Sequence, residues 1–279
     1  LYIPGLGGEE YAENELDKWL YLNYTVPYNI EVVYRWDAAQ SYSSLSEVQL
    51  VPVEFDAVQP MMAALRDVWF KPYIQATGNS LDFLKEVAPK KIVLVGSPEY
   101  QNGSFKLGQA EGGRKILLLN VNNFDASNEN ELKEALHTIV HEFTHILHQT
   151  KLFNQEYQTI STGRYNSNWT LLNDSEARHQ GFITNYAMLN KDEDFAEMVS
   201  GILVFGYEWF KDTVLAEAAK STENPHAKAD LEAKLAIVNS YFKETWNIEF
   251  FDNETSGEPG LESYFRMAIE EVVSNPPTK

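Results

Sequence analysis

The chain has 279 residues, of which 44% are hydrophobic, and a formal net charge of −19. This length is enough for one sizeable hydrophobic core, and the acidic balance argues against a nucleic-acid partner because a phosphate backbone needs a basic surface. The sequence contains no cysteine, which excludes disulfides and thiolate zinc sites, and it contains no apolar run long enough to span a bilayer.

The first part of the chain is predicted to mix helices and strands. Residues 9–22 and 56–70 carry apolar side chains at helical spacing. Residues 29–36 are rich in β-branched and aromatic types, and residues 91–95 and 115–121 form short apolar runs. Each of these last three segments therefore predicts a strand.

The rest of the chain is predicted to be mainly helical. A glycine-rich, hairpin-like connection is expected over 96–113, and a long helix from about 128 to 150. Residues 151–173 are polar and aromatic and predict a long surface loop. From residue 174 onward the pattern is helical almost to the end, with one helix expected from Pro225 to about Trp246.

This order of elements predicts a single α+β domain over residues 1–279. Strands fall in the first half, so a mixed lobe with a small sheet is expected up to about residue 150, where the long helix ends. A mainly helical lobe that carries the third metal ligand would follow over about 151–279. We expect an active-site cleft between the two lobes.

The long predicted helix contains the motif His141-Glu142-Phe143-Thr144-His145. Two histidines four residues apart on a helix face the same way, so both imidazoles can reach one metal ion. Glu142 is offset by about 100° around the helix axis, so it approaches an open coordination position instead of binding the metal. There it can take a proton from a water whose pKa the metal lowers to about 7. The motif therefore predicts a zinc hydrolase with His141 and His145 as ligands and Glu142 as the general base.

Two stripes of side chains follow the predicted helix on opposite sides. The apolar stripe consists of Leu132, Leu136, Ile139, Phe143 and Leu147. The histidine stripe consists of His137, His141, His145 and His148. The apolar stripe would pack on the first lobe, and a metal between the lobes would give the histidines their neighbour. The alternative is a histidine cluster that is solvated or hydrogen-bonded within the core, with no metal. For His137 and His148 we favour a position next to the metal site, as a hydrogen-bond partner or a cleft-wall residue, over the role of a ligand.

A third ligand is expected on a later helix. The metzincin pattern fails, because Lys151 stands where its third histidine would be. Glu193 and Glu197 lie one helical turn apart, away from the apolar side chains of their segment. One carboxylate would bind zinc and the other would orient a ligand histidine through its free ring N–H. We favour Glu193 as the ligand and Glu197 as its support; the reversed assignment and two ordinary exposed acids are the alternatives.

The combination of the histidine motif with Glu193-Asp194-Phe195-Ala196-Glu197 resembles the gluzincin peptidases, such as anthrax lethal factor and the proline-proline endopeptidases. The resemblance implies that the first glutamate of this segment, Glu193, is the zinc ligand. Those peptidases carry a tyrosine seven residues earlier that is aimed at the developing oxyanion. Tyr186 occupies that position here, and an ordinary packing role for it is the alternative.

Longer stretches of the chain are similar to the zinc-binding metallopeptidase lipoproteins of Bacteroidota. These stretches are residues 29–36, 96–98, 110–116 and 137–149. The resemblance implies a zincin-like metalloprotease fold, a Zn²⁺ cofactor and a lipid-anchored protein of the bacterial outer membrane, with the anchor preceding Leu1. It also implies an association with SusC/SusD-type nutrient importers.

The predicted function is a zinc metallopeptidase that acts on a peptide or protein substrate. The strand over 115–121 is expected to form the upper edge of the cleft and to pair with an extended peptide. One alternative is a zinc hydrolase of another amide or ester in glycans or modified peptides, because the motif specifies activated water and not the bond attacked. A second alternative is a non-catalytic binding lipoprotein associated with an importer, whose aromatic side chains stack on sugars.

Overall fold

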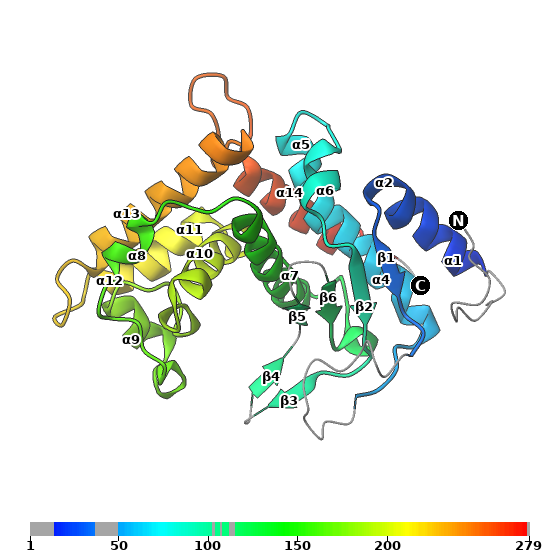
Figure 1. The fold of residues 1–279 in the computed structure, drawn as a ribbon, viewed down its shortest axis with the longest axis horizontal. Helices are drawn as coiled ribbons and strands as arrows, with labels where there is room; N and C mark the ends of the chain where they lie inside the picture. The colour runs from blue at the N-terminus through cyan, green and yellow to red at the C-terminus, as the bar shows by residue number, and fades with distance from the viewer. Residues whose placement is uncertain (1–13, 37–49, 102–103, 107, 112–114, 278–279) are drawn as a thin grey trace.

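The computed structural model describes residues 14–36, 50–101, 104–106, 108–111 and 115–277 (Figure 1). The start of the helix predicted over 9–22 and parts of the connection predicted over 96–113 lie outside these described residues. Within them, helices dominate and are joined by a four-stranded sheet and a two-stranded sheet, so the predicted α+β class is confirmed.

The described chain begins with a helix that changes its hydrogen-bonding pattern along its length. Its segments are α1 (Glu15–Leu20), η1 (Tyr21–Thr25) and α2 (Val26–Tyr28). The Asn14 side chain accepts a hydrogen bond from the backbone N–H of Asp17, and the Asp17 carboxylate accepts one from the Asn14 backbone. This capping box fixes the helix start. The helix ends at Asn29, which adopts a left-handed conformation with φ of 57°.

A second long helix covers the segment predicted over 56–70 and continues beyond it. It comprises α4 (Phe55–Leu65), η2 (Arg66–Phe70) and α5 (Lys71–Ala76), and the short α6 (Asp82–Val87) follows. Pro60 lies in its second turn. The side chains of Val58, Met62, Leu65 and Trp69 are buried, as the helical spacing predicts.

The main sheet has four strands in the order β1-β2-β6-β5. Strands β1 (Glu31–Val33), β2 (Lys91–Leu94) and β6 (Lys115–Leu118) are parallel, and β5 (Gly108–Glu111) is antiparallel to β6. The prediction that the strand over 115–121 pairs with an extended peptide is wrong, because β6 is already hydrogen-bonded to β2 on one side and to β5 on the other.

The edge position on this side of the sheet belongs to β5 instead. A separate hairpin pairs β3 (Glu99–Gln101) with β4 (Ser104–Lys106), which agrees with the predicted hairpin-like connection. Strand β5 follows that hairpin and contacts α7 (Glu129–Thr150), the helix that carries the histidine motif.

Helix α7 lies at the centre of the molecule, between the sheet and the later helices (Figure 1). Asn128 caps its start, and all five residues of the predicted apolar stripe are buried. The Phe143 ring packs edge-on against Trp69 and Tyr73, with ring centres 5.4 and 5.2 Å apart. The helix is therefore held against the first half of the chain by aromatic contacts.

The segment predicted as a long surface loop over 151–173 contains ordered elements. They are α8 (Glu156–Ile160) and η4 (Trp169–Leu171). The Tyr157 side chain is fully buried, and its hydroxyl donates a hydrogen bond to the backbone oxygen of Asp194 at 3.0 Å. The prediction of a surface loop is therefore wrong at α8, because polar composition does not reveal a buried anchor such as Tyr157.

The helical second half of the chain agrees with its prediction. Its elements are α9 (Asp174–His179), η5 (Tyr186–Met188), α10 (Lys191–Phe205), α11 (Tyr207–Trp209), η6 (Phe210–Leu215), α12 (Ala216–Ala218), α13 (Ala227–Ser240), η7 (Tyr241–Thr245) and α14 (Leu261–Ser274). Helix α10 packs along α7, and α14 contacts both α10 and α5. One cluster of buried side chains therefore includes residues from both halves of the chain. Among the described helices, none combines the length and hydrophobicity needed to cross a membrane.

Candidate metal centre

The metal centre predicted from sequence lies where α10 packs against α7. His141 and His145 lie one turn apart on α7, and Glu193 lies in the first turn of α10. The Asn190 side chain accepts hydrogen bonds from the backbone N–H groups of Asp192 and Glu193, which fixes the start of α10. This helix cap therefore fixes the backbone position from which the Glu193 side chain extends towards α7.

The three predicted ligand atoms converge. The Nε2 atoms of His141 and His145 are 3.1 Å apart, and Glu193 Oε2 lies 2.9 Å from the first and 3.2 Å from the second. Zinc bonds of about 2.0–2.1 Å in a tetrahedron place ligand atoms roughly 3.3 Å apart. The triangle is therefore close to the size that a zinc ion requires, and it uses the nitrogen and oxygen donors that zinc accepts.

The second nitrogen of each ligand histidine has its own neighbour. Glu197 Oε1 lies 2.8 Å from His141 Nδ1, although the N–H direction is not aligned for an ideal hydrogen bond. The other oxygen of Glu197 accepts a hydrogen bond from the Thr184 hydroxyl at 2.7 Å. His148 Nε2 lies 2.9 Å from His145 Nδ1. Partners on both Nδ1 atoms favour the tautomers that turn the Nε2 lone pairs towards the metal position.

The electrostatics of the cluster favour a bound cation. Burial disfavours the charged form of His141, but Glu193 and Glu197 outweigh it and raise the pKa of His141 to about 10. Burial opposes ionisation of both carboxyls, yet the histidines hold the pKa of Glu193 well below its usual range and that of Glu197 at about 2. Two ionised carboxylates beside two imidazoles are a donor set that fits Zn²⁺.

Glu142 stands beside this triangle without joining it. Its side chain is half-buried on α7, and its charge raises the pKa of both His141 and Tyr186. The cluster of converging ligand atoms contains Glu193 and not Glu142. The role of Glu142 as the general base stays a prediction.

Tyr186 is brought to the centre by η5, the short turn that precedes α10. Its ring lies 5.7 Å from the His141 ring at an interplanar angle of 30°, and Trp169 packs edge-on against it at 4.8 Å. Burial raises the pKa of Tyr186 well above its ordinary value, and a hydrogen bond to Glu193 raises it further. The phenol therefore stays protonated and able to donate a hydrogen bond.

His137 is a neighbour of the cluster and not a member of it. Its Nε2 lies 3.1 Å from the Ser200 hydroxyl and 3.7 Å from Glu197 Oε1. Burial lowers the pKa of His137 and favours its neutral form. Three further side chains contact residues of the centre: Thr184 contacts Glu197, Ser200 contacts His137, and Trp169 contacts Tyr186. No periodic pattern in the sequence predicts these contacts, because each one joins two separate elements.

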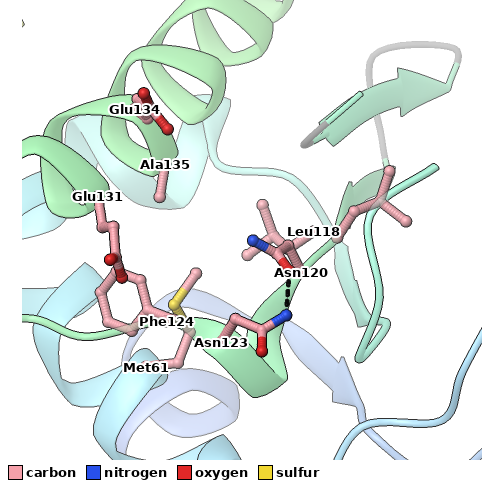
Figure 2. Close-up of a pocket in the computed structure, with 9 residues that line it drawn as sticks. Met61, Leu118, Asn120, Asn123, Phe124, Glu131, Glu134 and Ala135 are labelled. Carbon is pink, nitrogen blue, oxygen red and sulfur yellow. Dashed lines mark hydrogen bonds between the residues drawn. The ribbon is translucent and has the colours of Figure 1, made fainter. Parts of the chain in front are cut away.

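A small cavity lies beside the N-terminal turns of α7 (Figure 2), and none of the three possible metal ligands lines it. Its lining is Met61, Leu118, Leu119, Asn120, Asn123, Phe124, Glu131, Glu134 and Ala135. The Asn123 side chain donates a hydrogen bond to Asn120 Oδ1 at 2.7 Å on its wall. The Glu131 carboxylate accepts hydrogen bonds from the Asp125 backbone and the Asn128 side chain, so it stabilises the start of α7.

The fold is an α+β fold, and the site is a candidate zinc centre whose three possible ligands come from two helices. Residues 9–251 match the family described as “Putative zinc-binding metallo-peptidase”, and the chain belongs to that family. A crystal structure of a protein of the same description from Bacteroides caccae is 30% identical, with a TM-score of 0.73, and the match covers 95% of this chain and 96% of that one. Among curated proteins, none matches the chain. The predicted relationship to zinc-binding metallopeptidases and the predicted zinc cofactor are therefore confirmed.

Proposed function

We propose that this protein is a zinc-dependent peptidase of the gluzincin type, with His141, His145 and Glu193 as ligands. The observation that carries the proposal is the triangle of two imidazole nitrogens and one carboxylate oxygen, each within 3.2 Å of the others. Glu142 lies beside that triangle and is free of the ligand role. A purely structural zinc site has four protein ligands and no need of a base at its side.

In the proposed reaction, Glu142 accepts a proton from the attacking water and passes it to the leaving amine. Zinc supplies Lewis acidity when bound, because it lowers the pKa of water at the site and polarises a carbonyl. The protonated hydroxyl of Tyr186 donates a hydrogen bond to the oxyanion of the tetrahedral intermediate. Glu197 lies beside the Nδ1 atom of His141 and would keep that imidazole oriented towards the metal.

The substrate is proposed to be an extended peptide or protein segment. Among the described strands, β5 and not β6 lies at the edge of the sheet next to β6, and β5 contacts α7. The backbone groups on its outer side offer a template for strand addition, which recognises a peptide through its main chain. Main-chain recognition favours a peptide over a glycan amide, since a glycan cannot continue the sheet.

The test is cleavage of a diverse peptide mixture by the zinc-loaded protein, with Glu142→Gln as the matched control. The amide keeps the size of the side chain but cannot accept the proton. We expect the wild type to cut peptides and the variant to bind equal zinc while turning over on the order of 10²–10⁴ times more slowly. Equal cleavage by both proteins would refute the assignment of Glu142. Hydrolysis of glycan-derived amides or esters without peptide cleavage would favour the other class of zinc hydrolase.

We also propose that the protein acts in the bacterial cell envelope as an outer-membrane lipoprotein beside a SusC/SusD-type importer. Support comes from the similarity over residues 29–36, 96–98, 110–116 and 137–149 described above, and from the Bacteroides origin of the structural relative. Fractionation of the native organism, followed by co-purification with importer components, tests both statements. Recovery of the protein in the cytoplasmic fraction would contradict them.

A further inference from the structure

We propose that His148 is a positioning residue that holds the ring of His145 in place for zinc. This inference rests on the ligand set of the proposed function. His148 lies three residues after His145 on α7, so the two side chains are neighbours on one face of the helix. His148 Nε2 lies 2.9 Å from His145 Nδ1, while the opposite nitrogen of His145, Nε2, points into the triangle of ligand atoms.

The direction of this hydrogen bond follows from what a metal ligand requires. A neutral imidazole that offers its Nε2 lone pair to a metal carries its proton on Nδ1. The Nδ1–H of His145 therefore donates, and His148 Nε2 accepts. The contact would fix both the tautomer and the tilt of the His145 ring, which is the usual task of a partner behind a ligand histidine.

The His148 ring is itself held in place. Its side chain is buried, and it packs edge-on against Phe153 and Phe195, with ring centres 5.5 and 6.3 Å away. Those two phenylalanines stack on each other at 4.1 Å and 7°. Phe153 follows α7 and Phe195 belongs to α10, so the stacked pair ties the acceptor to both helices that supply ligands.

The two ligand histidines therefore have chemically different partners. His141 faces the carboxylate of Glu197, whereas His145 faces an imidazole. A carboxylate at both positions would add a further negative charge to a cluster that already contains the half-buried Glu193 and the buried Glu197. An imidazole supplies the same acceptor without that charge.

The decisive measurement is the zinc dissociation constant, obtained by competition with a chromogenic chelator. His148→Leu removes the acceptor but keeps an apolar side chain, and we expect zinc to bind roughly 10- to 100-fold more weakly. His148→Gln can place its amide oxygen near the position of Nε2, and it should recover most of the affinity. His226→Leu is the matched control, because His226 is an exposed histidine that immediately precedes α13. The zinc affinity of this variant should equal that of the wild type.

A second pair of variants guards against a simple packing effect. His148→Asn is as polar as His148→Gln but one methylene shorter, so it should not reach His145 and should bind zinc as weakly as His148→Leu. Thermal unfolding of the metal-free variants reports on packing alone. The inference is overturned if His148→Leu binds zinc as tightly as the wild type, or if His148→Gln is as weak as His148→Asn. Failure of the proposed function looks different: the wild type would bind zinc with the expected dependence on His148 and cleave no peptide.

Discussion

Asp194 and Lys234 form an ion pair with 2.7 Å between Oδ2 and Nζ, although neither side chain is exposed to solvent. The Asp194 carboxylate also accepts hydrogen bonds from the hydroxyls of Tyr157 and Tyr165, and Lys234 donates to the backbone oxygen of Gly181 at 2.8 Å. Asp194 follows Glu193 in the first turn of α10. The pair therefore links α13 to the turn of helix that carries the proposed carboxylate ligand.

Replacing one member of this pair should be far more harmful than replacing both. Lys234→Met leaves the Asp194 carboxylate buried without its counter-charge, which costs about 3–5 kcal/mol for a broken buried pair. The double variant Asp194→Leu with Lys234→Met removes both charges, and we expect it to recover a large part of that loss. Urea unfolding of the metal-free proteins measures the difference. If the double variant is less stable than Lys234→Met alone, the prediction is wrong, and the uncompensated charge of Asp194 is not the main cause of the loss of stability in the single variant.

The assignment of Glu193 as ligand and Glu197 as support predicts unequal effects on zinc. Glu193→Ala removes an oxygen of the triangle and should release the metal during dialysis. Glu197→Ala leaves the triangle intact and removes the partner of His141 Nδ1, so zinc should bind roughly 10- to 100-fold more weakly but still stoichiometrically at high concentration. Metal analysis after dialysis separates the two. Retention of zinc by Glu193→Ala together with loss from Glu197→Ala would reverse the assignment.

The parts of this centre that sequence predicts are those encoded by local spacing. The i and i+4 histidines of α7 and the glutamate of α10 belong to helices whose apolar faces are regular, so their directions follow from helix geometry. The bounds of α7 agree with the expected 128–150 within a residue for the same reason. Only the resemblance to the gluzincin peptidases predicts a role for Tyr186, because the helix that contains Glu193 begins after Asn190 and helical spacing does not extend back to Tyr186.

What sequence does not predict depends on contacts between distant segments. Strand β5 reads Gly-Gln-Ala-Glu, which carries no strand pattern, and its pairing with β6 alone defines it. Tyr157 lies in the polar segment 151–173 but is buried, because its helix α8 packs against α10 and α13. The support of Glu197 by Thr184 joins a loop to a helix in the same way. Such tertiary contacts override local composition.

Tyr186→Phe tests the oxyanion donor. The substitution keeps the ring that packs on His141 and Trp169 and removes only the hydroxyl. We expect kcat to fall about 10²- to 10³-fold, as for the loss of one oxyanion donor, while zinc content stays stoichiometric. Steady-state kinetics on the best peptide, with metal analysis of the same sample, gives both values. An unchanged kcat would leave Tyr186 as a packing residue.

Zinc affinity should rise with pH, because the metal takes the place of a proton. Burial opposes the charge on His141, but Glu193 and Glu197 raise its pKa to about 10 in the metal-free protein, against about 6.5 for an unfolded chain. The stability that this proton contributes is fully present below about pH 6.5 and is lost as pH rises through about 10. Zinc competes with that proton over the same pH window. If one proton is released for each zinc ion bound, the free energy of zinc binding becomes more favourable by about 1.4 kcal/mol for each unit of pH increase.

Two measurements between pH 6.5 and 9 check this linkage. Chelator competition should show zinc binding that tightens steadily, and urea unfolding of the metal-free protein should show stability that declines. Glu197→Gln is the control, because it removes one of the charges that hold the proton on His141 and should move both transitions to lower pH. Zinc affinity independent of pH over this range would mean that His141 is already neutral in the metal-free protein, and that the two carboxylates do not hold a proton on its ring.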